Sequence, residues 1–190
     1  MALTPPPPAA LVIAGGRSTR FGSDKLRAEV DGRTVLQRTM EAVSGCAPVV
    51  LVSAADDPVP HGVLLVSEYP RWGGPCAGIA AGVAALPADA VETLIVSADL
   101  ARPERAVAAL HGIASGLLAD QDGNTQWLLA RVPVDALRAQ LAQLEATGGT
   151  TGLPVRALLG PLGLPVVRAS DHAIADIDLP EDLDRLKEHA

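Results

Sequence analysis

The sequence predicts an α/β protein with a mainly parallel central sheet between two layers of helices. Short apolar runs alternate along the chain with segments whose apolar residues recur every three or four positions, which is the pattern of βαβ units. The 190 residues, 48% of them hydrophobic, suit a single domain with one core. Residues 1–8 end in a run of prolines, so we expect a disordered tail there and one domain over residues 9–190.

The expected strands are apolar runs that end in a loop. The first covers residues 9–14 and leads directly into Gly15 and Gly16, as a buried parallel strand does. Parallel sheets bind ligands at the carboxyl ends of their strands, so a site is expected in the segments that follow these runs. The other expected strands cover residues 49–53, 63–66, 93–97, 117–119, 128–132 and 165–168.

Helical periodicity marks the segments between these strands. Apolar residues within 35–43, 107–114 and 137–144 fall on one face of a helix. Residues 78–86 are rich in alanine and suit a tightly packed helix. A last helix is expected after Pro180, because proline fits the first position of a helix.

The composition argues against several classes of protein. The formal net charge of -7 disfavours general nucleic-acid binding, which needs a basic surface. The chain starts without the pattern of a signal peptide, and no apolar stretch is long enough to span a bilayer. Cys46 and Cys76 have neither metal-ligand spacing nor the number that a disulfide framework needs. We expect a cytoplasmic protein, a monomer or weak oligomer, without nucleic-acid or membrane partners.

The loop after the first strand predicts a polyphosphate site. Gly15 and Gly16 allow the backbone to approach a ligand and direct its N–H groups at it. Arg17, Arg20 and Lys25 concentrate positive charge in an otherwise acidic chain. The spacing fits neither a Walker loop, which has lysine directly after its second glycine, nor the G-x-G-x-x-G dinucleotide fingerprint.

Residues 11–25 read LVIAGGRSTRFGSDK, and this string resembles the signature of the molybdenum cofactor guanylyltransferases, the MobA-like NTP transferases. The relatives include the cytidylyltransferase of the same cofactor and, more distantly, the sugar-phosphate nucleotidyltransferases. The resemblance implies a Rossmann-like nucleotidyltransferase fold. It also implies transfer of a nucleoside monophosphate, GMP from GTP in the favoured case, to a phosphorylated acceptor, molybdopterin, with release of pyrophosphate.

Other segments carry the resemblance further along the chain. Residues 73–79 read GGPCAGI and resemble the family's G-P-x-A-G segment, which borders the nucleobase. Residues 93–100 end an apolar run at Asp99, which in the family coordinates Mg²⁺; the alternative is an aspartate that caps the next helix. Residues 122–130 resemble the family's hairpin, with Trp127 in place of a proline, so that its ring either covers the acceptor side of the cleft or fills the core.

The C-terminal segment departs from the guanylyltransferase pattern. Residues 176–183 read DIDLPEDL and resemble N-x-N-T-P-E-D-L, with Asp176 and Asp178 replacing the asparagines. Asp178 either caps the last helix or faces the metal. Arg156 either reaches an acceptor phosphate or is a solvated helix residue. Glu68 stands where guanylyltransferases tend to have Asp, whose carboxylate can accept hydrogen bonds from guanine N1–H and N2–H.

These observations define the expected site. Lys25 would neutralise charge at the α-phosphate and Arg20 would hold the leaving pyrophosphate, while Asp99 and Asp178 would hold Mg²⁺. Two alternatives remain open: a transferase for CTP or another NTP with a different phosphate acceptor, and a nucleotide-binding paralogue without catalysis. The expected nucleotide-binding residues are Ile13, Ala14, Gly15, Gly16, Lys25, Ser53, Glu68, Gly74, Gly78 and Asp99.

Overall fold

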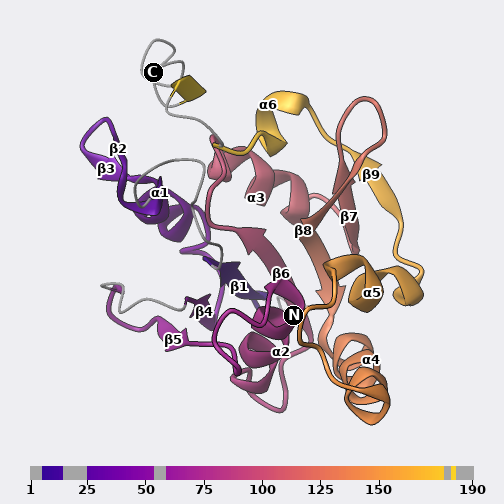
Figure 1. Cartoon of the computed structure of the whole chain (residues 1–190). Coiled ribbons are helices and arrows are strands. Elements are labelled where there is room, and N and C mark those ends of the chain that lie inside the picture. The colour runs from indigo at the N-terminus through magenta and orange to yellow at the C-terminus, as the bar shows by residue number, and fades with distance from the viewer. Residues whose placement is uncertain (1–5, 15–24, 54–58, 178–180, 183–190) are drawn as a thin grey trace, which may run out of the picture.

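A computed structural model of the chain describes residues 6–14, 25–53, 59–177 and 181–182. The described residues form one seven-stranded sheet with helices around it (Figure 1). Its strands are β1 (Ala9–Ile13), β4 (Val49–Val52), β5 (Leu64–Val66), β6 (Glu92–Ser97), β7 (Gly116–Ala119), β8 (Thr125–Pro133) and β9 (Val166–Arg168).

The strand order is β5-β4-β1-β6-β8-β7-β9, and β8 alone runs against the others. The chain therefore builds the sheet outwards from β1 through β4 to β5, then returns to place β6 on the other side of β1. In this register Ile13 pairs with both Val52 and Ser97, so β4, β1 and β6 end at one edge. A crevice between two strands whose connections diverge is the usual ligand site of an open α/β sheet.

Two hydrophobic clusters separate the layers. Alternate residues of β1 point to opposite faces, with Ala10 and Val12 in one cluster and Leu11 and Ile13 in the other. The helices are α1 (Val35–Ala42), α2 (Pro75–Ala84), α3 (Pro103–His111), α4 (Val134–Thr147), α5 (Val155–Leu159) and α6 (Asp171–Ile174). The first cluster includes residues of α1, α3 and α6, and the second includes residues of α2, α4 and α5.

Helix α2 packs closely on the sheet because it is built from small residues. A Cβ added to Gly78 would lie 3.3 Å from Val52 Cγ1, and one added to Gly82 would lie 3.1 Å from Leu11 Cδ2. The helix starts at Pro75, preceded by Gly74 with φ +91°, a backbone conformation that favours glycine. These residues bring the start of α2 up to the carboxyl edge of the sheet.

The predicted α/β fold and its seven strands are confirmed. Helices are present at the four expected places before residue 150, although α2 begins at Pro75 rather than at residue 78, with proline in the first turn. The helix expected after Pro180 lies mostly outside the described residues. The sequence did not predict α6 or the hairpin of β2 (Glu29–Val30) and β3 (Arg33–Thr34), and only one of the two interpretations of Arg156 implied a helix at α5. Across the described ranges, no helix combines the length and apolarity needed to cross a membrane.

Candidate active site

An ion pair joins two predicted site residues at the carboxyl edge. Lys25 opens a short 3-10 turn, and Asp99 follows the end of β6. The Lys25 Nζ atom lies 2.5 Å from Asp99 Oδ2 and also donates to the Ile177 carbonyl, at 3.1 Å. The two side chains are 17% and 22% exposed, so the pair is largely withdrawn from solvent but still open on one side.

Asp99 is held by its neighbours on both sides. The Ser97 hydroxyl donates to Asp99 Oδ1, and the Asp99 carbonyl accepts from Ile177 N at 2.8 Å. A second bond, from Ala101 N to Ala175 O at 2.8 Å, continues this pairing. Residues 175–177 therefore run beside 99–101 and fix the backbone that carries the carboxylate.

Helix α1 supports the same loop. The Thr39 side chain is fully buried, and its hydroxyl lies 3.1 Å from Ala98 O and 3.3 Å from Val35 O. Neither Thr39, which lies within the expected helix at 35–43, nor Ser97 was singled out from the sequence. A polar residue two positions before a strand-end aspartate, and a threonine within an apolar face, are the signals that were available.

Ser53 and Glu68 follow the carboxyl ends of β4 and β5. Ser53 is buried; its N–H donates to Val66 O at 2.9 Å, and its carbonyl accepts from the Ser67 hydroxyl at 2.5 Å. Glu68 is only 5% exposed. Its Oε1 accepts from Trp72 N at 3.2 Å, whereas its Oε2 is buried and finds no hydrogen-bond partner within the described ranges.

The predicted residues at the end of β1 have their backbone groups committed to the sheet. Ala14 N donates to Val52 O at 2.8 Å, and Ile13 O accepts from Ala98 N at 3.0 Å. The Ile13 side chain is buried in the core. Ile13 therefore supports the end of β1 and offers no side-chain group to a ligand. The remaining predicted residues Gly15, Gly16, Arg20 and Asp178 lie outside the described residues.

At this edge Asp99 offers its carboxylate to a metal ion. No group of three or more His, Cys, Asp or Glu side chains placed to hold a metal occurs among those residues. The oxygens of Asp99 are hard donors of the kind that Mg²⁺ accepts, and Mg²⁺ commonly takes one or two carboxylates and completes its shell with water and substrate phosphates. The donor set therefore fits a metal that arrives with a polyphosphate.

A cavity of about 370 Å³ opens beside the ion pair, on the side of β6 that faces β8. Ser97 and Asp176 line it next to Asp99, and Trp127 and Arg156 line it from β8 and α5. Trp127 is only partly buried and also packs against the second cluster. The ring therefore lines the cavity and packs on the core at the same time, so each of the two interpretations offered for it describes one of its sides.

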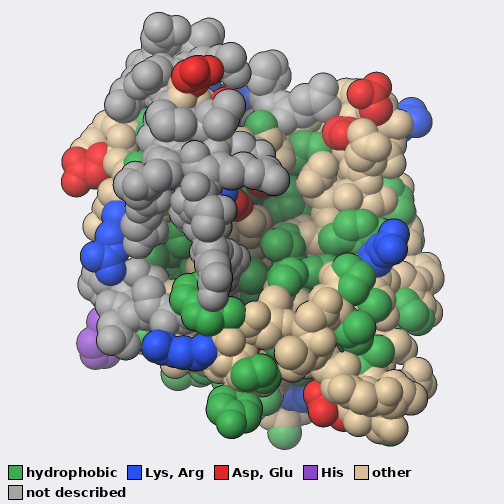
Figure 2. Space-filling model, viewed as in Figure 1, with side chains coloured by type: hydrophobic (Ala, Val, Ile, Leu, Met, Phe, Trp, Pro, Cys, Tyr) green, Lys and Arg blue, Asp and Glu red, His purple; other side chains and the backbone are tan. Residues whose placement is uncertain are grey.

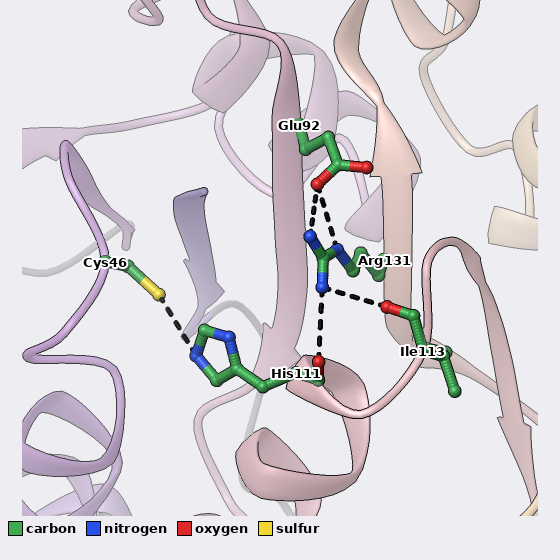
Figure 3. A network of polar contacts seen from close by, with 5 residues as sticks. All are labelled: Cys46, Glu92, His111, Ile113 and Arg131. Atoms are coloured by element: carbon green, nitrogen blue, oxygen red, sulfur yellow. Dashed lines mark hydrogen bonds and ion pairs between the residues drawn. The ribbon is translucent and has the colours of Figure 1, made fainter. Parts of the chain in front are cut away.

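A cysteine–histidine pair at the opposite edge is not a second catalytic centre (Figure 3). The Cys46 Sγ lies 4.0 Å from His111 Nε2, but burial raises the pKa of the Cys46 thiol, with Arg131 offsetting this in part, so the thiol stays protonated at neutral pH. Arg131 donates to Glu92 and to the carbonyls of His111 and Ile113. The network joins β6, β8 and the end of α3 as a structural support.

The chain matches a known family over most of its length. The family of MobA-like NTP transferase domains matches residues 10–163. The molybdenum cofactor guanylyltransferase of Acidiphilium cryptum (strain JF-5) is 32% identical over 92% of this chain and 91% of its own. That of Rhodobacter capsulatus is 30% identical over 96% of this chain and 98% of its own.

Solved structures with lower identity share the fold. The molybdopterin-guanine dinucleotide biosynthesis protein A of Archaeoglobus fulgidus superimposes with a TM-score of 0.66, at 19% identity, over 95% of this chain and 97% of the other. The 2-C-methyl-D-erythritol 4-phosphate cytidylyltransferase of Thermus thermophilus gives a TM-score of 0.65, at 19% identity, over 96% and 98%. The matched domain, the relatives and the fold agree: this chain belongs to the MobA-like NTP transferase family, and its activity is nucleotidyl transfer.

Proposed function

We propose that the protein transfers GMP from GTP to molybdopterin in the synthesis of the molybdenum cofactor, with release of pyrophosphate and with Mg²⁺ as its metal. The curated relatives carry the name molybdenum cofactor guanylyltransferase, which supports both the nucleotide and the acceptor. The choice of GTP rests on one observation: the buried Oε2 atom of Glu68 has no hydrogen-bond partner among the described residues.

The carboxylate of Glu68 matches the hydrogen-bonding edge of guanine. An ionised carboxylate only accepts hydrogen bonds, and guanine is the base that presents two adjacent donors, N1–H and N2–H, on one edge. Leaving a buried acceptor unpaired costs about 1 to 3 kcal/mol, and a guanine that donates to Oε2 would remove this cost. Glu68 follows β5 and lies close to Gly73 at the start of α2, the segment expected to border the base.

Lys25 and Asp99 would have different roles at the phosphates. The metal, held by Asp99 and by Asp178 from the C-terminal segment, would supply positive charge at the phosphate oxygens. The Lys25 ammonium would bind an α-phosphate oxygen and stabilise the charge that develops there. Arg20 would hold the pyrophosphate, and the N–H groups of Gly15 and Gly16 would line the triphosphate.

The reaction needs no covalent enzyme intermediate. An oxygen of the acceptor phosphate attacks the α-phosphorus of GTP in line with the leaving group. The new bond forms as the bond from that phosphorus to the bridging α–β oxygen breaks, and the electron pair leaves with pyrophosphate. The protein contributes positioning and charge stabilisation, and Ser97 and Thr39 keep the Asp99 loop in place for this.

The choice of base is tested by pyrophosphate release with four NTPs and molybdopterin. We expect release with GTP, and weaker binding of inosine triphosphate, which lacks the N2 amino group. Replacing Glu68 by glutamine substitutes a donor for an acceptor and should raise the KM for GTP by about 10- to 100-fold, as hydrogen bonds to charged groups do. Release with CTP in place of GTP would contradict the guanine assignment, and binding without release under every pairing would indicate a non-catalytic paralogue.

Two further parts of the proposal concern the protein in the cell. Cys46 and Cys76 are both free and buried, which is compatible with the reducing cytoplasm that we assign to it. We also assign it one domain over residues 9–190. We assign it as a monomer or weak oligomer, and sedimentation at several concentrations would test this oligomeric state.

A further inference from the structure

Strand β5 lies at one edge of the sheet and has an apolar surface. Among the described residues it pairs only with β4, and Figure 1 shows it on the outer side of the molecule. The side chains of Leu64 and Leu65 in this strand are 45% and 39% exposed. In the space-filling view, hydrophobic side chains reach the surface on the side where β5 and the start of α2 lie (Figure 2). An exposed apolar edge strand is a template on which another strand can pair.

The loop that follows β5 adds two aromatic rings to this surface. Tyr69 is 94% exposed and Trp72 is 52% exposed, in a chain that has one Phe, one Tyr and two Trp residues. Tyrosine and tryptophan are enriched among the residues that dominate the binding energy of protein interfaces. We call Leu64, Leu65, Tyr69 and Trp72 the β5 surface.

The β5 strand lacks the charged residues that prevent pairing at many sheet edges. Residues 59–67 contain no Asp, Glu, Lys or Arg, whereas β9 at the other edge of the sheet carries the exposed Arg168. The loop after β5 adds one exposed charge, Arg71, whose sign is opposite to the formal net charge of -7 of the chain. A second copy of this acidic chain therefore meets least electrostatic repulsion at β5.

The backbone of β5 determines how a second copy would pair. Val66 O accepts from Ser53 N at 2.9 Å, so Val66 turns its backbone groups towards β4. Because successive residues of a strand turn these groups to opposite sides, Leu65 directs its N–H and carbonyl away from β4. An antiparallel pair about a two-fold axis would place Leu65 opposite Leu65 of the second copy, and the two residues would exchange both hydrogen bonds. Tyr69 would then lie beside the segment that leads into the other β5.

We propose that the protein forms a two-fold dimer through the β5 surface, with antiparallel pairing of the two edge strands. An aromatic side chain buries about 150 to 250 Å², so two β5 surfaces at their present exposure would bury about 1,000 Å² in total. This area is at the lower end for a specific interface, and we expect a weak dimer with a Kd of roughly 1 to 100 μM. The proposal goes beyond the proposed function, and neither depends on the other.

Leu65→Cys tests the pairing directly. Opposite residues in a hydrogen-bonded antiparallel pair have Cα atoms about 5.5 Å apart, so a short bifunctional maleimide can join the two thiols across the axis. The natural Cys46 and Cys76 are both buried, and neither should react as fast as the new thiol. We expect cross-linked dimers of Leu65→Cys. Val166→Cys, at a position on the other edge strand that is 52% exposed, is the matched control and should stay monomeric.

Sedimentation of the unmodified chain, at concentrations below and above the expected Kd, tests the dimer without a cross-linker. Leu65→Lys places two like charges on the two-fold axis and should raise the Kd at least tenfold, whereas Val166→Lys should leave it within twofold. Tyr69→Ala removes two rings from each dimer, because the interface is symmetric, and should raise the Kd about 30-fold. Circular dichroism measures whether each variant is folded.

Three results would overturn the proposal. The first is a monomer at every concentration together with no cross-linking of Leu65→Cys. The second is a dimer that Leu65→Lys does not weaken, or that Val166→Lys weakens equally, since it must use another surface. The third is equal cross-linking of Leu65→Cys and Val166→Cys, which would show random collision. If Leu65→Lys fails to fold, Tyr69→Ala takes its place, and an unchanged Kd in that variant would exclude the β5 surface.

Discussion

Replacing Lys25 by methionine should move metal affinity and turnover in opposite directions. In the structure without substrates the Lys25 ammonium lies 2.5 Å from Asp99 Oδ2, so it occupies the position from which a metal would reach this oxygen. A metal that binds alone must displace the ammonium, and both cations compete for one carboxylate. Methionine keeps most of the side-chain volume and removes the charge.

The magnitude follows from the geometry of the pair. At 2.5 Å and an effective dielectric constant of about 20, the direct attraction is roughly 7 kcal/mol. Most of it is offset by the cost of withdrawing both charges from water. Because the side chains are 17% and 22% exposed, the net value should lie between those of exposed and buried pairs, at about 1 to 2 kcal/mol. Metal affinity without nucleotide should therefore rise about 5- to 30-fold.

The assay is Mn²⁺ binding followed by electron paramagnetic resonance, with Mg²⁺ as competitor and without nucleotide. Turnover of the same variant should fall by about 100- to 1000-fold, the usual effect of removing one contact to developing charge. Arg33→Met is the matched control, since it removes one charge from an exposed pair with Glu41 and should leave metal affinity within twofold. If Lys25→Met weakens Mn²⁺ binding, or leaves it unchanged, the competition argument is wrong.

Three other predictions concern the groups around this pair. Asp99→Asn should lower Mn²⁺ affinity by at least tenfold and reduce turnover with it, because an amide oxygen lacks the charge that a hard cation prefers; an unchanged metal response would make Asp178 the main ligand. Thr39→Val removes the hydroxyl that lies 3.1 Å from Ala98 O and should lower the free energy of unfolding by about 1 to 3 kcal/mol, with a several-fold loss in kcat. Thr39→Ser, which keeps the hydroxyl, should retain most of the kcat, and equal losses in both variants would assign the effect to packing. Burial holds the pKa of the Cys46 and Cys76 thiols above their ordinary value of 9.0, so the unfolded chain releases these protons first and stability should fall as pH rises above about 9. Denaturant unfolding from pH 7 to 10 measures this, and a flatter profile is expected for Cys46→Ala.

The meeting of Lys25 and Asp99 could be expected from the sequence. Both residues follow apolar runs that are typical of parallel strands or of the loop after one, and parallel strands end at a common edge. All residues of β1 and β4 are buried, which is why their apolar runs could be recognised as parallel strands. Strands buried on both faces leave a continuous apolar signal that needs no tertiary information.

Other features of the site depend on contacts that leave no local pattern. The pairing of residues 175–177 with 99–101 joins segments far apart in sequence, and three residues are too few for any periodicity. Helix α5, with five residues, is also too short for a 3.6-residue pattern to appear. The sequence therefore left the place of the Trp127 ring open, because α5 and β8 together form the wall on which it lies.

Under the proposed function, the position of Asp99 in the strand order would let one aspartate serve both substrates. β6 is the central strand, with β1, β4 and β5 on one side and β8, β7 and β9 on the other. Lys25 and Asp99 meet at the edge where β1 and β6 end, which is the point where the chain reverses its direction of growth. Under the proposed function, residues on the β5 side that bind the base could vary without disturbing the Lys25–Asp99 pair. That pair would have to stay fixed, since the bond that breaks and the bond that forms would both lie next to it.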